Sequence, residues 1–128
     1  RTAMPTDRVI DGVDLLPFLN HKRSGRPHDQ LFWRSGHYRM MISGDWKLQV
    51  TDHPRKDWLY NLKDDPYEKN NLAAARPETV SQLKAALAAH ERSQVKPLWP
   101  ALVESPIGID KTLSQPLLAS DEMIYWPI

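Results

Sequence analysis

The middle of the chain alternates between apolar and polar residues in the way that strands of a half-buried sheet do. In chain order the predicted strands are 31–33, 38–42, 46–50 and 58–60, of which the second and third alternate and the first and last are short apolar runs of strand type. Ser35-Gly36 interrupts the first, and Ser43-Gly44-Asp45 has the composition of a tight turn between the second and third. A polar loop from Thr51 to Asp57 separates the last two. Short connections of this kind join antiparallel neighbours.

The spacing of apolar residues changes after the last predicted strand. Pro77 suits the first turn of a helix, and Glu78 complements the helix dipole there. Val80, Leu83 and Leu87 then recur at spacings of three and four, which predicts an amphipathic helix over residues 77–92. The sequence therefore predicts an α+β fold of about four antiparallel strands packed against one amphipathic helix.

The ends of the chain have another character. Near the start, Asp14 can cap a short helix over residues 15–19, which Pro17 limits to about one turn. Residues 94–128 contain five prolines and no clear period, yet they are too apolar for a disordered segment. We expect this extended, proline-rich tail to wrap the rest of the protein, with Ile124 to Trp126 adding an edge strand. Trp99 and Trp126 are expected to anchor it.

The composition narrows the functional classes. The 128 residues include 17 basic and 16 acidic side chains, which gives a formal net charge of +1. The chain therefore lacks the excess positive charge that attracts proteins to nucleic acid. There is no cysteine, which excludes a disulfide framework and a thiolate metal site. No apolar run is long enough to predict a membrane span. The start at Arg1 and the proline-rich end indicate a piece of a larger protein.

Several short motifs occur in a specific order. Gly44-Asp45-Trp46-Lys47-Leu48 is followed by Leu59-Tyr60-Asn61-Leu62 and then by the segment 65–72, which contains Asp65-Pro66, Glu68 and Asn71-Leu72. Their residue types predict structural roles: Gly44 for a turn, Trp46 and Leu48 for the core, and Asn71 for hydrogen bonds to backbone.

This order resembles the C-terminal subdomain of the sulfatases, which belong to the alkaline phosphatase superfamily. Residues 11–17 and 27–34 are similar to the segments that lead into that subdomain, so the resemblance covers about Val9 to Glu91. The end of the tail, Tyr125-Trp126-Pro127, looks like an extension of some bacterial members. The resemblance implies three parts: a linker at 1–8, the subdomain at 9–92 and a wrapping tail at 93–128.

The resemblance places the chemistry elsewhere in the enzyme. Family members hydrolyse sulfate monoesters with a formylglycine, made from Cys or Ser in a Cys/Ser-x-Pro/Ala-x-Arg motif, and with a calcium ion. This sequence contains no such motif, so we expect no catalytic residue, no metal and no cofactor in this chain. The implied partners are an N-terminal catalytic domain of the same protein and a sulfated small molecule or glycan, and a homo-oligomer stays open. The resemblance favours a periplasmic or secreted location, although a cytoplasmic one is not ruled out.

Three polar residues are candidates for substrate binding: Arg34, His37 and Arg39. In the family this hairpin region can lie beside the active-site mouth. An arginine fork can bind sulfate, and a histidine can donate to a sugar hydroxyl. The alternative is that the arginines form the solvated face of a strand.

Other polar and aromatic residues favour structural roles. His28, His37 and His53 lack the spacing of a metal site, and no carboxylate pair accompanies them in the sequence. The basic loop around His21-Lys22-Arg23 is typical of a solvated surface. Trp33, Trp46 and Trp58 can stack on sugars, but aromatic residues at strand spacing are more often core.

Two alternative functions remain at this stage. A related hydrolase of phosphonate or phosphate esters would carry a similar subdomain. A glycan-binding or assembly module would instead be a soluble monomer with its own affinity for sulfated glycans. A sulfatase subdomain should expose an apolar docking face when isolated.

Overall fold

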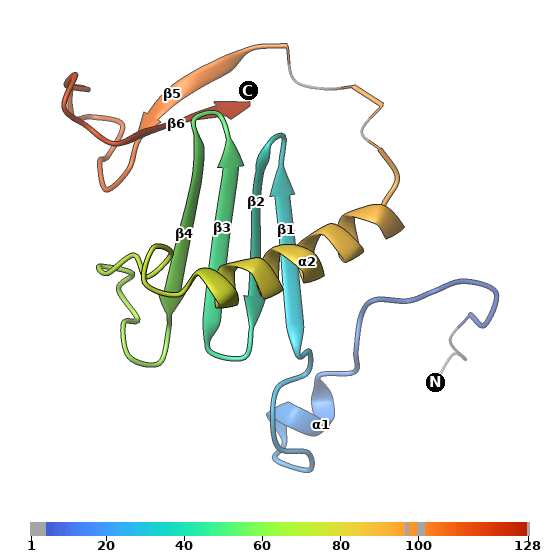
Figure 1. Cartoon of the computed structure of the whole chain (residues 1–128). Helices are drawn as coiled ribbons and strands as arrows, with labels where there is room; N and C mark the ends of the chain where they lie inside the picture. The colour runs from blue at the N-terminus through green and yellow to red at the C-terminus, as the bar shows by residue number, and fades with distance from the viewer. Residues whose placement is uncertain (1–4, 97, 100–101, 128) are drawn as a thin grey trace.

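The computed structural model describes residues 5–96, 98–99 and 102–127. It confirms the α+β class (Figure 1). The elements, in chain order, are α1 (Leu16–Leu19), β1 (Gln30–Ser35), β2 (Tyr38–Ser43), β3 (Trp46–Asp52), β4 (Arg55–Asn61), α2 (Pro77–Ser93), β5 (Glu104–Gly108) and β6 (Met123–Pro127). The short α1 helix lies where it was predicted, and the Asp14 carboxylate accepts a hydrogen bond from the Leu16 N–H at 3.0 Å.

The main sheet is an antiparallel meander in the order β1-β2-β3-β4. Its register aligns Met41, Leu48 and Leu59 across the β2–β3 and β3–β4 pairings, and all three side chains are fully buried. The prediction of a polar loop from Thr51 to Asp57 is wrong, because these residues belong to β3, β4 and the tight turn between them. The residues on both sides of His53-Pro54 pair with one another, because ladder hydrogen bonds use the backbone and do not require apolar side chains.

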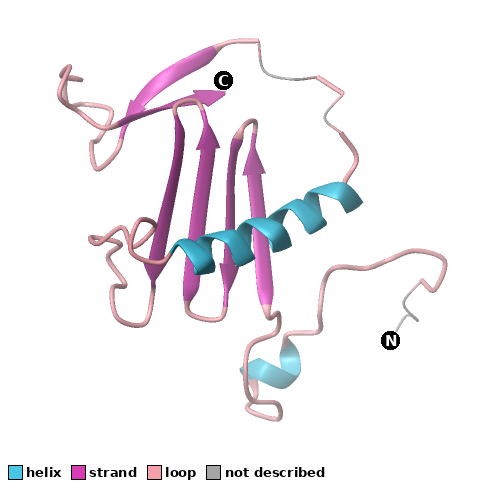
Figure 2. Cartoon of the chain, in the orientation of Figure 1, coloured by secondary structure: helices cyan, strands magenta, loops and turns pink. Residues whose placement is uncertain are grey.

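Helix α2 covers one face of this sheet, as predicted (Figure 2). Val80, Leu83 and Leu87 are buried and pack in one cluster with the inward-facing residues of β2, β3 and β4. Burying a leucine of this kind contributes roughly 1.5–3 kcal/mol. This face of the sheet therefore holds the main core.

The loop between β4 and α2 closes the outer edge of the sheet. Asn71 Oδ1 accepts from the Leu59 N–H at 3.0 Å, and the Leu72 N–H donates to the Leu59 carbonyl at 2.8 Å. Asp65 accepts from the backbone N–H groups of Lys69 and Asn70, and these hydrogen bonds lower the pKa of the Asp65 carboxyl. The predicted turn roles of Asp65 and Asn71 are confirmed.

The tail differs from the prediction. Residues 123–127 do not extend the main sheet but pair with β5 in a separate two-stranded sheet. Residues 123–127 cannot pair with this part of the β4 edge, because Asn71 and Leu72 already form hydrogen bonds with the backbone of Leu59. Ile124 instead packs against Trp58 and Tyr60, on the face opposite α2. Trp126 joins this second cluster, whereas the Trp99 side chain is 86% exposed and does not anchor the tail.

Candidate functional site

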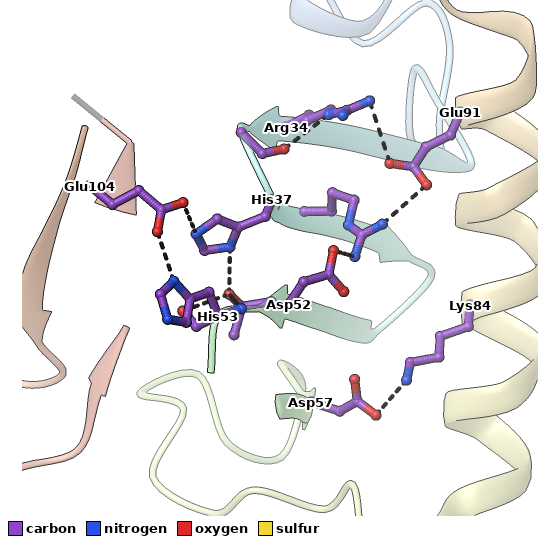
Figure 3. Close-up of polar contacts among 11 residues, drawn as sticks. Arg34, His37, Asp52, His53, Asp57, Lys84, Glu91 and Glu104 are labelled. Atoms are coloured by element: carbon purple, nitrogen blue, oxygen red, sulfur yellow. Dashed lines mark hydrogen bonds and ion pairs between the residues drawn. The ribbon is translucent and has the colours of Figure 1, made fainter. Parts of the chain in front are cut away.

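Two of the three predicted site residues lie together beside helix α2. Arg34 and Arg39 are paired across β1 and β2, and Glu91 of α2 lies between their guanidinium groups (Figure 3). Arg39 Nη2 donates to Asp52 at 2.7 Å, and Arg39 Nη1 lies 3.5 Å from Glu91. Arg34 Nη1 is 3.8 Å from Glu91, and its Nε donates to the Gly36 carbonyl at 3.0 Å.

The exposure of the two arginines separates their roles. The Arg39 side chain is 22% exposed and held by two carboxylates, whereas the Arg34 side chain is 47% exposed and, among the carboxylates of the described residues, contacts Glu91 alone, at the longer distance of 3.8 Å. Surface ion pairs of this length are weak. Arg34 is therefore the guanidinium that an incoming anion can engage without breaking a close ion pair.

A cavity of about 310 Å³ adjoins these arginines. Leu87 and Val95 contribute apolar surface to it, and the His90 ring stacks on Phe32 with centroids 4.0 Å apart. Trp33, whose side chain is 45% exposed, borders the cavity on the edge strand β1. The cavity combines a guanidinium with aromatic surface, which is a suitable lining for an anionic ring compound.

His37 makes a different set of contacts. It lies in the turn between β1 and β2, where its Nδ1 is 2.8 Å from the Thr51 hydroxyl. Its Nε2 is 3.1 Å from Glu104 Oε1, at an angle outside hydrogen-bond geometry. His53 Nδ1 contacts the other carboxylate oxygen of Glu104 at 2.7 Å (Figure 3). The two imidazole rings meet edge to face, with centroids 6.0 Å apart.

Sequence spacing gave no sign of this cluster. Glu104 follows His53 by 51 positions, and the tail hairpin brings it back to the two turns that carry the histidines. Within the described part of the chain, His37, His53 and Glu104 are the one group of three His, Asp or Glu residues whose ligand atoms all lie within 4.8 Å of one another. His28 lines a separate groove near the N-terminal segment.

A third site lies on the face opposite α2, under the tail hairpin. A cavity of about 300 Å³ is lined there by Tyr38, Tyr60 and the carboxylates of Glu68 and Asp110. Burial, followed by the charge of Glu68, raises the pKa of Tyr60 to about 12 and raises that of Tyr38. Lys47 pairs with Glu68 at 2.6 Å. Because Asp110 adds a further negative charge, this cavity is less favourable to a sulfate than the one beside Arg34.

Part of the apolar surface has no cover in the described structure. Leu31 and Trp33 alternate with the inward-facing Phe32, so they lie on the face opposite α2, and they are 40% and 45% exposed. On that face the tail hairpin packs on Trp58 and Tyr60 of β4 and on Tyr38 at the start of β2. An apolar groove lined by Val13, Leu15 and Leu31 continues this surface toward the N-terminal segment.

The sequence contains no position for the sulfatase nucleophile. It has no cysteine, and no serine begins a Ser-x-Pro/Ala-x-Arg pattern. Ser114 has proline two positions later, but Leu118 stands where that pattern needs arginine. The His/Glu cluster also does not fit calcium, which prefers oxygen ligands. Among the described helices, none combines the length and the apolar character that crossing a membrane requires.

Comparison with known proteins finds a distant similarity to a sulfatase. The chain is 26% identical over 151 aligned positions to the uncharacterized sulfatase YdeN of Escherichia coli (strain K12). The alignment covers 88% of this chain but only 27% of that protein, so the chain spans about a quarter of the length of the curated relative. No protein-family model matches the chain. These findings support a distant relationship to a sulfatase.

Proposed function

We propose that this chain is the C-terminal portion of an enzyme that hydrolyses sulfate monoesters, R-O-SO₃⁻ + H₂O giving R-OH, sulfate and a proton. The observation that carries the proposal is the similarity to a sulfatase along 88% of the chain, which spans only 27% of that protein. The order of the motifs from Gly44 to Leu72 supports it. The formylglycine and the calcium ion would then belong to a part of the protein outside this chain.

The role of the chain in such an enzyme is to support the catalytic domain. The uncovered side chains of Leu31 and Trp33, continued by the groove at Val13 and Leu15, form an apolar surface suited to bury against a larger partner. The catalytic domain of the same protein is the partner that we propose.

The same arrangement can provide one wall of the substrate pocket. We assign this wall to the cavity beside Arg34, because its guanidinium is exposed and is held only loosely by Glu91. Arg39 supports Glu91 and thereby sets the position of Arg34. His37 takes no part in this proposed wall, since its ring nitrogens face Thr51 and Glu104.

An Arg34→Ala substitution in the complete enzyme tests this wall. Loss of a charge-assisted contact of about 1.5–3 kcal/mol should lower kcat/KM by roughly 10- to 150-fold, mainly through a higher KM. Arg92→Ala is the matched control, because Arg92 is an exposed arginine of the same helix end and should leave both constants unchanged. Equal kinetics for the two variants would remove Arg34 from the pocket.

The activity itself is tested with the complete protein produced together with a formylglycine-generating system. Paired aryl sulfate, aryl phosphate and aryl phosphonate esters should show preferential sulfate release. Preferential cleavage of the phosphorus esters would identify a related hydrolase instead. A complete gene without a formylglycine precursor motif, together with saturable binding of sulfated glycans by the chain alone, would favour a non-catalytic binding module.

A further inference from the structure

The contacts of Thr51 suit His37 as a metal ligand. The Thr51 hydroxyl lies 2.8 Å from His37 Nδ1, and it also lies 3.3 Å from the His53 nitrogen and 3.4 Å from the His53 carbonyl oxygen. A neutral His37 that donates from Nδ1 to this hydroxyl has an unprotonated Nε2, which can then bind a metal ion.

His37 Nε2 is shielded from solvent and has no hydrogen bond within the described structure. A carboxylate oxygen of Glu104 lies 3.1 Å from it, outside hydrogen-bond geometry, and a cation between the two atoms would satisfy both. His53 Nδ1 is hydrogen-bonded to the other oxygen of this carboxylate at 2.7 Å, and a metal ion would replace the proton of that bond.

We propose that His37, His53 and Glu104 form a binding site for one Zn²⁺ ion. Two imidazoles and one carboxylate are a zinc ligand set, whereas calcium and magnesium prefer oxygen ligands alone. Ligand atoms about 2.0–2.2 Å from a tetrahedral zinc lie about 3.4 Å apart. The present separations of 3.1 and 2.7 Å, which involve the two different oxygens of Glu104, would need to open by about 0.3 and 0.7 Å. A fourth position is left for water.

The surroundings hold the ligands in place. Thr51, only 2% exposed, orients the His37 ring through Nδ1, which is the outer contact that metal-bound histidines usually make. The His53 ring stacks on Tyr125 with centroids 4.3 Å apart, and the Tyr125 N–H donates to the His53 carbonyl. The ligand positions are thus supported by both the sheet and the tail hairpin.

Zinc at this site would join three segments that are distant in the sequence. His37 comes from the β1–β2 turn, His53 from the β3–β4 turn and Glu104 from β5 (Figure 3). The ion would therefore fasten the tail hairpin to the end of the main sheet. This proposal is independent of the proposed sulfatase activity.

Calorimetric titration of the chelator-treated, tag-free full chain with ZnCl₂ tests the site. We expect saturation at one ion per chain, a zinc-dependent rise in Tm and, with Co²⁺ as a probe, visible absorption bands of a low-coordinate ion. Glu104→Gln and His53→Ala should each weaken zinc binding at least about tenfold, and Thr51→Val, which removes only the orienting hydroxyl, about 10- to 100-fold.

The control variant carries His21→Ala and His28→Ala together, because these histidines are outside the cluster. It should bind zinc like the wild-type chain. Absence of saturable binding would overturn the proposal, as would loss of binding in the control or unchanged binding in Glu104→Gln. Far-UV circular dichroism separates lost binding from lost folding, and the carboxamide of Glu104→Gln keeps the shape of the native side chain.

Discussion

Asn71 provides a sharp test of how the edge of the main sheet is closed. Its Oδ1 accepts from the N–H groups of Leu59 and Ala73, both at 3.0 Å, and its Nδ2 donates to the Asp57 carbonyl at 3.1 Å. One exposed side chain thereby bonds the outer edge of β4 and the start of the loop that leads to α2. Asn71→Ala removes these three hydrogen bonds and creates no clash.

The expected cost follows from the burial of each partner. The bond to Leu59 is part-buried, and Leu59 itself is fully buried, so its loss should cost about 1.5 kcal/mol. Water can replace the two bonds in exposed surroundings, which should cost about 0.5 kcal/mol each. The free energy of unfolding should therefore fall by about 2.5 kcal/mol.

Urea unfolding followed by circular dichroism measures this loss. With m of about 2 kcal/mol/M, the midpoint should fall by roughly 1 M at unchanged m. Asn70→Ala is the matched control, because Asn70 is an exposed neighbour that bonds Asp65 only through its backbone, and it should stay within about 0.5 kcal/mol of wild type. If the two variants unfold at the same urea concentration, the edge of β4 does not depend on Asn71.

Two further predictions concern the face opposite α2. Burial, followed by the charge of Glu68, raises the pKa of Tyr60 to about 12 from about 10 in unfolded chains, so stability should be complete below pH 10 and decline as pH rises toward 12. Tyr60→Phe should remove this part of alkaline unfolding, and an unchanged alkaline midpoint would contradict the assignment. Thermal unfolding should show that Gly36→Ala destabilises the protein more than Gly44→Ala. Both glycines have φ near +57°, so either substitution costs about 1–2 kcal/mol of backbone strain. Only at Gly36 would the added Cβ also lie 2.6 Å from Pro127. Equal losses in Tm would mean that the tail hairpin does not press on this turn.

The main sheet and its helix could be predicted because local and tertiary requirements agree there. Residues 46–50 alternate strictly between apolar and polar side chains, and the turn at Gly44 needs the positive φ that a glycine at this position predicts. Val80, Leu83 and Leu87 have the spacing of a single buried stripe, and each is buried. The β3–β4 turn was missed because the paired residues around His53-Pro54 are polar and carry no period-two signal.

The candidate sites could be predicted only in part. Arg34 and Arg39 were selected through the family resemblance and stand opposite each other in the β1–β2 register, while their role in substrate binding stays a prediction. The contact of Glu91 with both depends on the angle at which α2 crosses the sheet, which the sequence pattern does not determine. The contact of Glu104 with the two histidines could not be predicted from the sequence, because it depends on how an irregular tail returns to the sheet.

The distribution of apolar residues on β1 bears on what this chain packs against. Leu31, Phe32 and Trp33 are consecutive, so β1 has apolar side chains on both faces, as strands buried on both sides do. Phe32 packs against the α2 core, while Leu31 and Trp33 remain 40% and 45% exposed. Within the described structure the tail hairpin packs instead on Trp58 and Tyr60 of β4 and on Tyr38 at the start of β2. A partner that covers this side must therefore approach at β1 and at the groove beside Val13, which leaves the cavity next to Arg34 at the rim of the resulting interface.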